Sequence, residues 1–376
     1  MNILIVTANY PTPYRVKYQF VKELVCAFSR CGHCCYVISP YSLTKERHWM
    51  SYLSEEDGVT VCRPKFLSFS TWRIAGISPS YIFRKRALYR ALRRMNFRPD
   101  VVYTHFWNAA EWTYEFARDN RLPLFVASGE AEIVKQFDMK LLTKEFSDYI
   151  SGVICVSQKN KEESVSLELT TAEKCEVFPN AVDGSLFRKM DRSLCRKELG
   201  FPQDAYIVVF VGAFCERKGS LRLSAAIGKI KDITVHSVFV GGGSDEPTCD
   251  NILFKGELPH EMLPKYLNAS DVFVLPTLHE GCCNAIVEAL ACGLPVISSD
   301  RPFNWDVLND KNSIMLDPAS VDDLAEAIRS LSDVNRRNAY ADNALASASG
   351  RMIDNRAEDI LRFIQSRMEG GNQSVS

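Results

Sequence analysis

Short apolar runs alternate with longer amphipathic stretches along most of this 376-residue chain. A short apolar run bounded by turn residues is typical of a buried strand, and a long amphipathic stretch is typical of a helix. Strands that alternate with helices form parallel sheets with helices on both faces. The first series has predicted strands at 3–7, 35–39, 59–64, 101–104, 124–127 and 152–156, with helices at 19–30 and 81–95.

The pattern then restarts, with predicted strands at 206–211, 234–241, 251–255, 272–275, 296–298 and 313–316. Two series in one chain predict two doubly wound domains, with the seam at 183–190. We expect a first domain over 1–185 and a second over 186–350. Ligands bind outside the carboxyl ends of such strands, so two domains that face each other would hold the site in the cleft between them.

A last amphipathic helix is predicted at 355–368, and no strand follows it. The segment 351–370 is expected to pack back towards the first domain. The polar, glycine-containing tail at 369–376 is expected to be disordered.

Composition and charge exclude several classes of protein. Lys and Arg total 45 against 46 Asp and Glu, so the formal charge of −1 gives no net attraction to nucleic acid. No apolar run approaches the roughly 20 residues needed to span a bilayer, and the first residues lack a signal peptide's basic leader. We therefore expect a cytoplasmic protein. The thirteen cysteines are scattered, and the cluster at 31–35 has no second ligand pair at zinc-site spacing, so no metal is predicted.

One stretch between Tyr81 and Arg98 is strongly basic and has no acidic residue. Its basic residues are Arg84, Lys85, Arg86, Arg90, Arg93, Arg94 and Arg98. Helical periodicity puts the apolar residues on the opposite face, namely Ala87, Leu88, Ala91, Leu92 and Met95. One interpretation is a solvated helix face, and the other is a patch for anionic lipid or for a phosphorylated acceptor.

The loop at 279–284 lies between a predicted strand and a helix predicted at 285–292, with Asn284 as the expected N-cap. A loop that leads backbone N–H groups into a helix N-terminus is an anion site. Glu280 in the loop and Glu288 in the helix would accept hydrogen bonds from sugar hydroxyls. The alternative is a helix-terminal Glu and a solvated loop Glu.

In context, this stretch resembles the signature of glycosyltransferase family 4, which has Glu, seven residues, Glu and then a tail like the one at 291–297. Further matches follow the family's order: Asn9-Tyr10-Pro11, Val156-Ser157, the hinge segment 178–183 with Phe187, Val211-Gly212, Arg217-Lys218-Gly219, Gly241-Gly242-Gly243, Gly256 and 269–272. Ala181 replaces the family's usual Gly in the hinge segment. The resemblance implies an α/β protein of GT-B architecture, in which two doubly wound, Rossmann-like domains face a central cleft.

The resemblance also implies roles for individual residues. Glu288 would bind the nucleotide ribose, and Glu280 would lie near the donor sugar. Arg217 and Lys218 would neutralise the diphosphate in place of a metal ion, although a solvated turn is the alternative for this pair. Four further positions are implied in donor binding: Gly212 for close approach to the phosphates, Cys283 and Asn284 in the anion loop, and the backbone around Leu258 beside the base.

The implied activity is a retaining, metal-independent hexosyltransferase that uses no cofactor besides its nucleotide-sugar donor. The leaving phosphate itself would take the acceptor proton, so no paired carboxylates of the hydrolase type are required. Family analogy suggests a glycan or polyprenyl-linked acceptor in bacterial surface-polysaccharide synthesis. The stripe from Arg84 to Arg98 would then hold the protein against the anionic inner face of the membrane.

The first half departs from the family pattern. The loop at 10–15 has no Gly, and Ser128 stands where relatives have His, followed by Gly129 and Glu130. Ser128 and Glu130 are therefore predicted to take part in ligand binding. His105, at the end of a predicted strand, is either a catalytic contact or a hydrogen-bonded strand-end His.

Three rival functions were weighed. A nicotinamide dehydrogenase is excluded because no Gly-x-Gly-x-x-Gly follows the first strand and the glycines at 241–243 have the wrong spacing. A sugar-nucleotide epimerase or hydrolase of the same architecture would need a set of acid–base residues that is not evident. A non-catalytic partner subunit is favoured only by the altered loops of the first half.

Overall fold

The computed structural model describes residues 1–14, 18–45, 48–69, 78–136, 139 and 143–373. Arg15 of the glycine-free loop and the last three residues of the predicted tail lie outside these ranges. The chain divides into two compact units. The first comprises Met1–Phe178 with Arg356–Ser376, and the second is Pro179–Asn355. The change of unit therefore falls before Pro179, a few residues ahead of the predicted seam.

The first unit is built on an eight-stranded sheet in the order β10-β9-β8-β7-β1-β2-β5-β4. All neighbours are parallel except the edge pair β4–β5, which is antiparallel. The strands are β1 (Asn2–Thr7), β2 (Cys34–Ile38), β4 (Leu53–Glu56), β5 (Val59–Cys62), β7 (Val101–His105), β8 (Leu124–Ser128), β9 (Ile150–Cys155) and β10 (Cys175–Val177). A separate pair joins β3 (Tyr41–Ser42) to β6 (Lys65–Phe66).

Helices cover both faces of this sheet because alternate strand residues point to opposite sides. Leu4 packs with residues of α2 (Pro79–Arg94) and α3 (Trp107–Asp119) in one core cluster. Tyr103 points the other way and meets Phe28 of α1 (Gln19–Arg30). The remaining helices are α4 (Ile133–Gln136), α5 (Lys144–Tyr149), α6 (Gln158–Ser166) and the 3-10 turn η2 (Ala172–Lys174).

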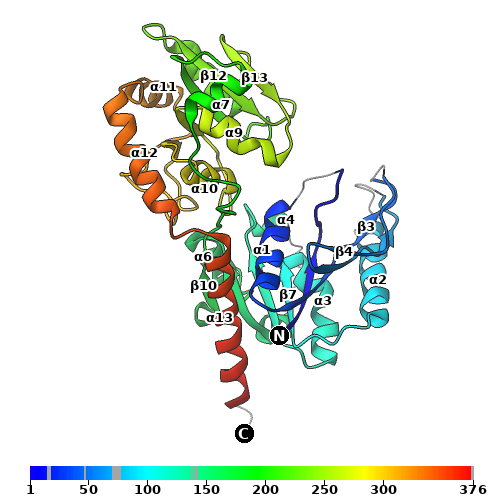
Figure 1. The fold of residues 1–376 in the computed structure, drawn as a ribbon. Helices are drawn as coiled ribbons and strands as arrows, with labels where there is room; N and C mark the ends of the chain where they lie inside the picture. Colours follow the sequence, from blue (N-terminus) through cyan, green and yellow to red (C-terminus); the bar gives the residue numbers. More distant parts are fainter. Residues whose placement is uncertain (15–17, 46–47, 70–77, 137–138, 140–142, 374–376) are drawn as a thin grey trace. The chain divides into compact units, whose positions relative to one another are not determined.

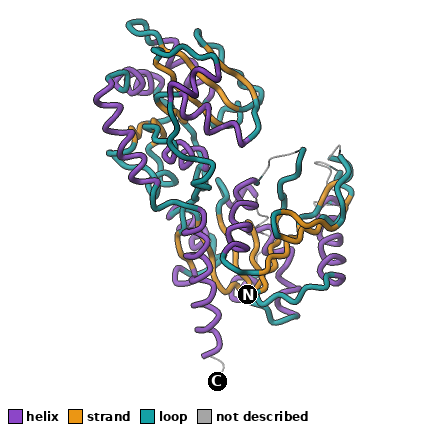
Figure 2. The backbone as a smooth tube through the Cα atoms, viewed as in Figure 1, coloured by secondary structure: helices purple, strands orange, loops and turns teal. Residues whose placement is uncertain are grey.

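The second unit has a wholly parallel six-stranded sheet in the order β13-β12-β11-β14-β15-β16. Its strands are β11 (Tyr206–Val211), β12 (Val235–Val240), β13 (Ile252–Gly256), β14 (Val272–Leu275), β15 (Val296–Ser299) and β16 (Ser313–Leu316). Its helices are α7 (Arg192–Leu199), α8 (Ser220–Lys229), η3 (His260–Met262), α9 (Leu263–Ala269), α10 (Asn284–Ala291), α11 (Val321–Ser330) and α12 (Val334–Ala348). Figure 2 shows the strands of each unit surrounded by helices.

Helix α13 (Ile353–Gln373) brings the end of the chain back to the first unit, where it lies beside α6 and β10 (Figure 1). Phe363 contacts the rings of Phe125 and Phe178, with centroids 6.1 and 5.7 Å apart. The helix is longer than predicted, so residues 369–373 are helical rather than disordered. No described helix is both long enough and apolar enough to cross a membrane.

Candidate nucleotide-sugar site and its surroundings

The candidate site of the second unit lies where the strand order reverses, between β11 and β14. Ligands of a doubly wound sheet bind at this switch point, outside the carboxyl ends of the strands. The loop after β11 carries Arg217 and Lys218 towards α8, and the loop after β14 carries Glu280 towards α10. The two loops are joined, because Leu278 N donates a hydrogen bond to Arg217 O at 2.8 Å.

The Glu280 carboxylate is held between two cations. Its Oε1 lies 2.6 Å from Lys218 Nζ and 2.7 Å from Arg217 Nη1. Thr277 Oγ1 donates a third hydrogen bond to the same oxygen at 2.8 Å. The Glu280 and Lys218 side chains are 12% and 13% exposed, whereas that of Arg217 is 41% exposed. Arg217 is therefore the cation that a ligand reaches most easily.

This pairing keeps the cluster ionised despite its burial. Burial alone would raise the pKa of Glu280, but Lys218 and Arg217 outweigh it and hold that pKa below its usual range. Burial would likewise lower the pKa of Lys218, but Cys283 and Glu280 outweigh it and raise that pKa. Two cations against one carboxylate leave one positive charge in excess. An anionic ligand is favoured by such an excess.

A second glycine-containing loop crosses the loop after β11 at close range. Gly241 has φ +144°, and a Cβ at this position would lie 2.0 Å from the carbonyl oxygen of Gly212. Gly212 N in turn donates to Val240 O at 2.9 Å. Gly241 is therefore a position where no side chain fits, and the approach of Gly212 to a phosphate stays a prediction.

The loop before α10 is fastened differently from the prediction. Asn284 is not the N-cap, because Cys283 occupies the cap position and Asn284 is the first helical residue. The physical reason is that Asn284 Oδ1 accepts a hydrogen bond from Asn180 Nδ2 at 2.7 Å instead of capping its own helix. Asn180 also donates to Cys282 O at 2.9 Å. The thiol of Cys283 lies 3.7 Å from Lys218 Nζ, so the cap residue borders the charged cluster.

Glu288 lies one turn inside α10 and is 8% exposed. Its Oε1 is 3.2 Å from His260 Nε2, and the imidazole of His260 packs against the ring of Phe187 at 5.1 Å. His260 follows the half-buried Leu258 by two residues. The contact thus brings the predicted neighbour of the base close to the predicted ligand of the ribose.

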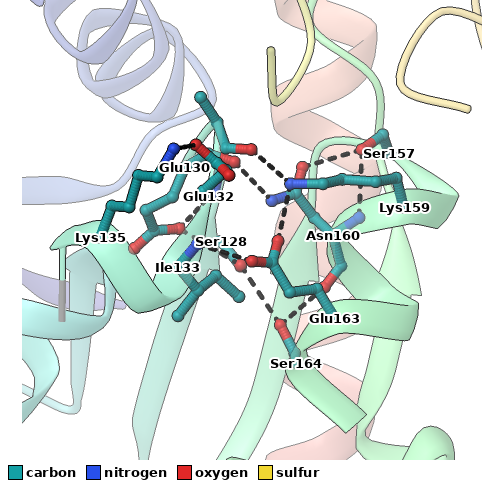
Figure 3. A network of polar contacts seen from close by, with 12 residues as sticks. Ser128, Glu130, Glu132, Ile133, Lys135, Ser157, Lys159, Asn160, Glu163 and Ser164 are labelled. Atoms are coloured by element: carbon teal, nitrogen blue, oxygen red, sulfur yellow. Dashed lines mark hydrogen bonds and ion pairs between the residues drawn. The ribbon is translucent and has the colours of Figure 1, made fainter. Parts of the chain in front are cut away.

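In the first unit, Ser128 and Glu130 belong to a buried polar network (Figure 3). Glu130 Oε1 accepts a hydrogen bond from Trp107 N, at the start of α3, and Oε2 accepts one from Gly129 N, at 2.8 and 3.0 Å. Ser128 Oγ accepts one from Trp107 Nε1 at 3.1 Å, and Asn160 Nδ2 donates to Glu130 O at 2.9 Å. These contacts hold the loop after β8 against α3. A ligand could reach either side chain only by opening the network.

His105 ends β7, beside the switch point of the first sheet, and is 5% exposed. Burial, with the nearby charge of Arg356, lowers the pKa of His105 to about 3, so the imidazole is neutral at physiological pH. Its Nδ1 has no hydrogen-bond partner among the described residues, and the ring packs against Phe20 and Phe106. Among the described residues, the Nδ1 of His105 therefore lacks the hydrogen bond expected of a structural His at the end of a strand. The catalytic role of His105 stays a prediction.

The predicted basic stripe begins in α2, ends at Arg98 beyond the end of that helix, and divides into two parts. Five of its members are exposed, namely Arg86, Arg90, Arg93, Arg94 and Arg98, and the opposite face buries Ala87, Leu88, Ala91 and Leu92 as the periodicity predicts. The other two members do not face solvent freely. Lys85 Nζ lies 2.9 Å from Glu111 Oε1, and the Arg84 guanidinium lies over the rings of Phe66 and Trp112.

Three contacts of the candidate site were not predicted. The hydroxyl of Thr277, the imidazole of His260 and the amide of Asn180 all support residues that motif reasoning did find. Thr277 and Asn180 lie in loops and His260 begins the 3-10 turn η3, and the pairs that Asn180 forms are more than 100 positions apart in sequence. Asn180 belongs to the hinge segment that matches the family pattern. That match is the sequence signal that could have pointed to a role for Asn180.

Metal-binding groups are sparse in the part of the chain that the structure describes. Within it, no group of three or more His, Cys, Asp or Glu has the arrangement of a metal site. The thirteen cysteines are free thiols.

Two doubly wound units in one chain are the architecture of the GT-B class of α/β proteins, and the charged cluster lies at the switch point of the second unit. The chain belongs to the family 4 glycosyltransferases: residues 19–186 match the family model described as "Glycosyltransferase Family 4", and residues 205–333 match "Glycosyl transferases group 1".

Similar proteins of known description support this membership. A putative teichuronic acid biosynthesis glycosyltransferase, TuaC of Bacillus subtilis, is 30% identical over 254 residues, a segment that covers 64% of each chain. The match thus spans just under two thirds of that relative's length. A UDP-Gal:alpha-D-GlcNAc-diphosphoundecaprenol alpha-1,3-galactosyltransferase of Escherichia coli is 27% identical over 280 residues, covering 68% of this chain and 72% of that protein.

Solved structures share the fold over nearly the whole chain. Sucrose-phosphate synthase from Thermosynechococcus elongatus superimposes with a TM-score of 0.81 at 18% identity, covering 98% of this chain and 100% of that one. HepE of Anabaena, solved in complex with UDP and glucose, gives a TM-score of 0.73 at 18% identity, covering 97% and 100%.

Proposed function

We propose that this chain is a retaining, metal-independent glycosyltransferase that moves a sugar from a nucleotide-sugar donor to a glycan or polyprenyl-linked acceptor. The observation that carries the proposal is the Glu280 cluster, in which Lys218 and Arg217 share one carboxylate oxygen at the switch point of the second sheet. A diphosphate offers these cations further negative charge, and the start of α10 adds backbone N–H groups.

The proposed chemistry follows from where charge develops. As the bond from the sugar to the diphosphate breaks, negative charge grows on the leaving oxygens, and the nearby cations stabilise it. Lys218 supplies a nearly buried charge, which acts more strongly than an exposed one. Arg217 is more exposed and can turn from Glu280 to a phosphate. Glu280 would then be free to accept hydrogen bonds from the donor sugar, and Glu288 from the ribose.

We place the reaction in bacterial surface-polysaccharide synthesis, on the cytoplasmic side of the membrane. The relatives support this setting, since one is described in teichuronic acid biosynthesis and another acts on a diphosphoundecaprenol-linked sugar. The exposed arginines of α2 would rest against anionic lipid headgroups, where each basic side chain contributes about 1 kcal/mol of binding. Such contact would bring a polyprenyl-linked acceptor to the first unit.

The test is a turnover assay after a thermal-shift screen of nucleoside diphosphates and their sugars. A ligand at about 100 times its Kd stabilises the protein by roughly 2.7 kcal/mol, which such a screen detects. With the donor identified, Lys218→Ala should lower kcat/KM by about 10²- to 10³-fold, because one charge at the leaving group is lost. Glu288→Ala should weaken donor binding, seen as a smaller thermal shift.

Lys229→Ala is the matched control, since it removes an exposed lysine near the end of α8 and should leave kcat/KM within about twofold. Excess EDTA should leave the rate unchanged, and the product should keep the donor's anomeric configuration. If the wild-type protein binds none of the nucleotides and releases no nucleoside diphosphate, the non-catalytic partner function is favoured instead.

A further inference from the structure

A cavity of about 350 Å³ opens in the second unit, at the amino ends of the parallel strands β14 and β15. Asp271 and Pro295 line it, and they directly precede these two strands. Glu280 follows the carboxyl end of β14, and a strand of four residues is roughly 13 Å long. The cavity is therefore separate from the candidate nucleotide-sugar site. Its volume falls within the roughly 300–1,000 Å³ of small-molecule sites.

Three arginines converge on the carboxylate of Asp271 in the wall of this cavity. Arg192 Nη1 lies 2.7 Å from Asp271 Oδ1, and Arg196 Nη2 lies 2.7 Å from Oδ2. Arg337 approaches Oδ1 as well, with its Nε at 3.6 Å. In the part of the chain that the structure describes, these are the only ion pairs that the three arginines form. Three positive charges thus share one negative charge.

The excess of positive charge acts within the cluster itself. Burial lowers the pKa of Arg196, Asp271 opposes that effect, and the charges of Arg192 and Arg337 lower the pKa further. An arginine keeps its proton at physiological pH, so all three charges remain. Like charges held this close repel one another, and an anion bound beside them would relieve the repulsion. The cluster therefore favours an anionic ligand.

Arg192 is the arginine of the cluster that a ligand can reach. It lines the cavity, and its side chain is 53% exposed, against 3% for Arg196 and 11% for Arg337. Arg196 and Arg337 also donate to two backbone carbonyls each, which ties them into the fold. Among the described residues, Arg192 uses only its Nη1, in the contact with Asp271. Its Nε and Nη2 therefore remain available to a ligand.

We propose that this cavity binds the phosphate group of a small phosphorylated molecule, with Arg192 as its principal donor. Nε and Nη2 form one edge of the guanidinium and can donate two parallel hydrogen bonds to phosphate oxygens. Arg337 and Lys189 line the same cavity and add positive charge, against which Asp191 is the only other acidic residue of the lining besides Asp271. The inference goes beyond the proposed function and does not depend on it.

Calorimetric titration of the whole chain with inorganic diphosphate tests the proposal. Diphosphate is also expected at the Glu280 cluster, so the wild type is compared with Lys218→Ala, which weakens that site alone. Lys218→Ala should retain one diphosphate site. Combining it with Arg192→Gln should weaken the retained site at least about tenfold, equivalent to ~1.4 kcal/mol. Unchanged binding in the double variant would overturn the assignment.

Arg336→Gln is the matched control, because it removes an exposed arginine of α12 that does not line the cavity, next to Arg337. In the Lys218→Ala background it should leave diphosphate binding within about twofold. Lys189→Gln provides a second variant that leaves the ion pairs of Asp271 intact, and it should weaken binding about threefold. Equal losses in Arg192→Gln and Arg336→Gln would indicate a general charge effect and overturn the site.

Two competitors test the class of ligand. Ribose 5-phosphate should displace diphosphate from the retained site of Lys218→Ala, and ribose should not. Hydrogen exchange measured by mass spectrometry should then show added protection at the start of α7, where Arg192 lies. Failure of ribose 5-phosphate to displace diphosphate overturns a site for phosphorylated molecules. The proposed function fails separately, if Lys218→Ala binds diphosphate and nucleotides like the wild type while the effect of Arg192→Gln persists.

Discussion

Glu280 and Glu130 are both nearly buried, yet their surroundings shift the pKa of each in opposite directions. Two cations outweigh burial at Glu280 and lower its pKa. At Glu130 burial dominates over the N–H groups of Trp107 and Gly129 and the Ser128 hydroxyl, and it raises the pKa to about 7. A carboxyl group with this pKa can hold a proton near neutral pH, whereas the Glu280 cluster stays charged.

Glu130→Gln should therefore change how stability depends on pH. Between pH 4.5 and about 7 the folded chain keeps a proton that the unfolded chain has released, so the wild-type free energy of unfolding falls as pH rises. Gln does not titrate, so the difference in favour of the variant should grow by on the order of 3 kcal/mol over that range. Urea unfolding at a series of pH values measures it.

Gln can also lose hydrogen bonds that the carboxyl group accepts, which adds an offset that does not vary with pH. Glu145→Gln, at an exposed glutamate of α5, controls for the loss of a carboxyl group. A constant difference between Glu130→Gln and wild type across pH 4–8 would contradict the protonated state.

Motif spacing predicted which charged residues gather in the candidate site, and their role in donor binding stays a prediction. Glu280, Glu288, Arg217 and Lys218 stand in the positions that the family pattern gives them. The sharing of one Glu280 oxygen could not be predicted, since it depends on two loops more than 60 residues apart folding against each other. The support from Thr277 was missed for another reason, because it lies in the same loop, three residues before Glu280, and depends on how that loop turns.

Among the elements, the crossing of the two glycine-containing loops limits substitution most. Gly241→Ala should cost at least about 2 kcal/mol, because its Cβ would overlap the carbonyl oxygen of Gly212 and its φ suits glycine alone. Gly242→Ala is the matched control, since its Cβ would meet only the exposed, flexible side chain of Glu257, at 3.1 Å. Thermal unfolding compares the two, and equal Tm values would contradict the close approach.

Helix α2 presents a basic face whose effect on membrane binding can be measured. Replacing Arg86, Arg90 and Arg93 together by Gln should weaken binding to phosphatidylglycerol vesicles on the order of 100-fold, at about 1 kcal/mol per residue. Vesicle sedimentation at low salt is suitable, because salt screens the attraction.

A charge-matched triple variant in the second unit, at the exposed residues Lys197, Lys231 and Arg336, controls for net charge. Equal losses in the two triple variants would indicate a general charge effect and contradict a specific role for α2.

Most long elements could be predicted because their hydrophobic period is clear. The strands Tyr206–Val211, Val272–Leu275 and Ser313–Leu316 have the predicted bounds. The strands that were not predicted are short. Their sequences have no hydrophobic pattern that indicates which residues are buried. β3 and β6 have two residues each and pair only with each other, while β4 lies at a sheet edge with mostly exposed side chains. Tertiary pairing, rather than local preference, creates such elements.

At the scale of the whole molecule, the chain leaves the first unit after Phe178 and re-enters it at Arg356. The two passages are tied together, because Arg356 Nη2 donates to Phe178 O at 3.2 Å and Val182 N donates to Arg351 O at 3.0 Å. Helix α13 then buries Ile360 and Ile364 within the first unit. The first unit is therefore discontinuous in sequence.

Removing α13 should destabilise the first unit and spare the second. Phe363→Ala, a milder change, should cost about 3–5 kcal/mol because its ring fills the space between Phe125 and Phe178. Hydrogen exchange measured by mass spectrometry should show lost protection in β8 and β9 and retained protection in β11 to β16. Truncation after Gly370 is the control and should leave protection unchanged. Uniform loss across both units would contradict this division.

The late return of α13 has a consequence for synthesis on the ribosome. Tyr103, Phe125 and Phe178 are translated early, but the helix that covers part of this face emerges only after the entire second unit. The apolar surface of the nascent first unit therefore stays uncovered while the second unit is translated. Translation of roughly 180 residues takes on the order of ten to thirty seconds. During that interval it is a natural client for chaperones, and the second unit can complete its fold first.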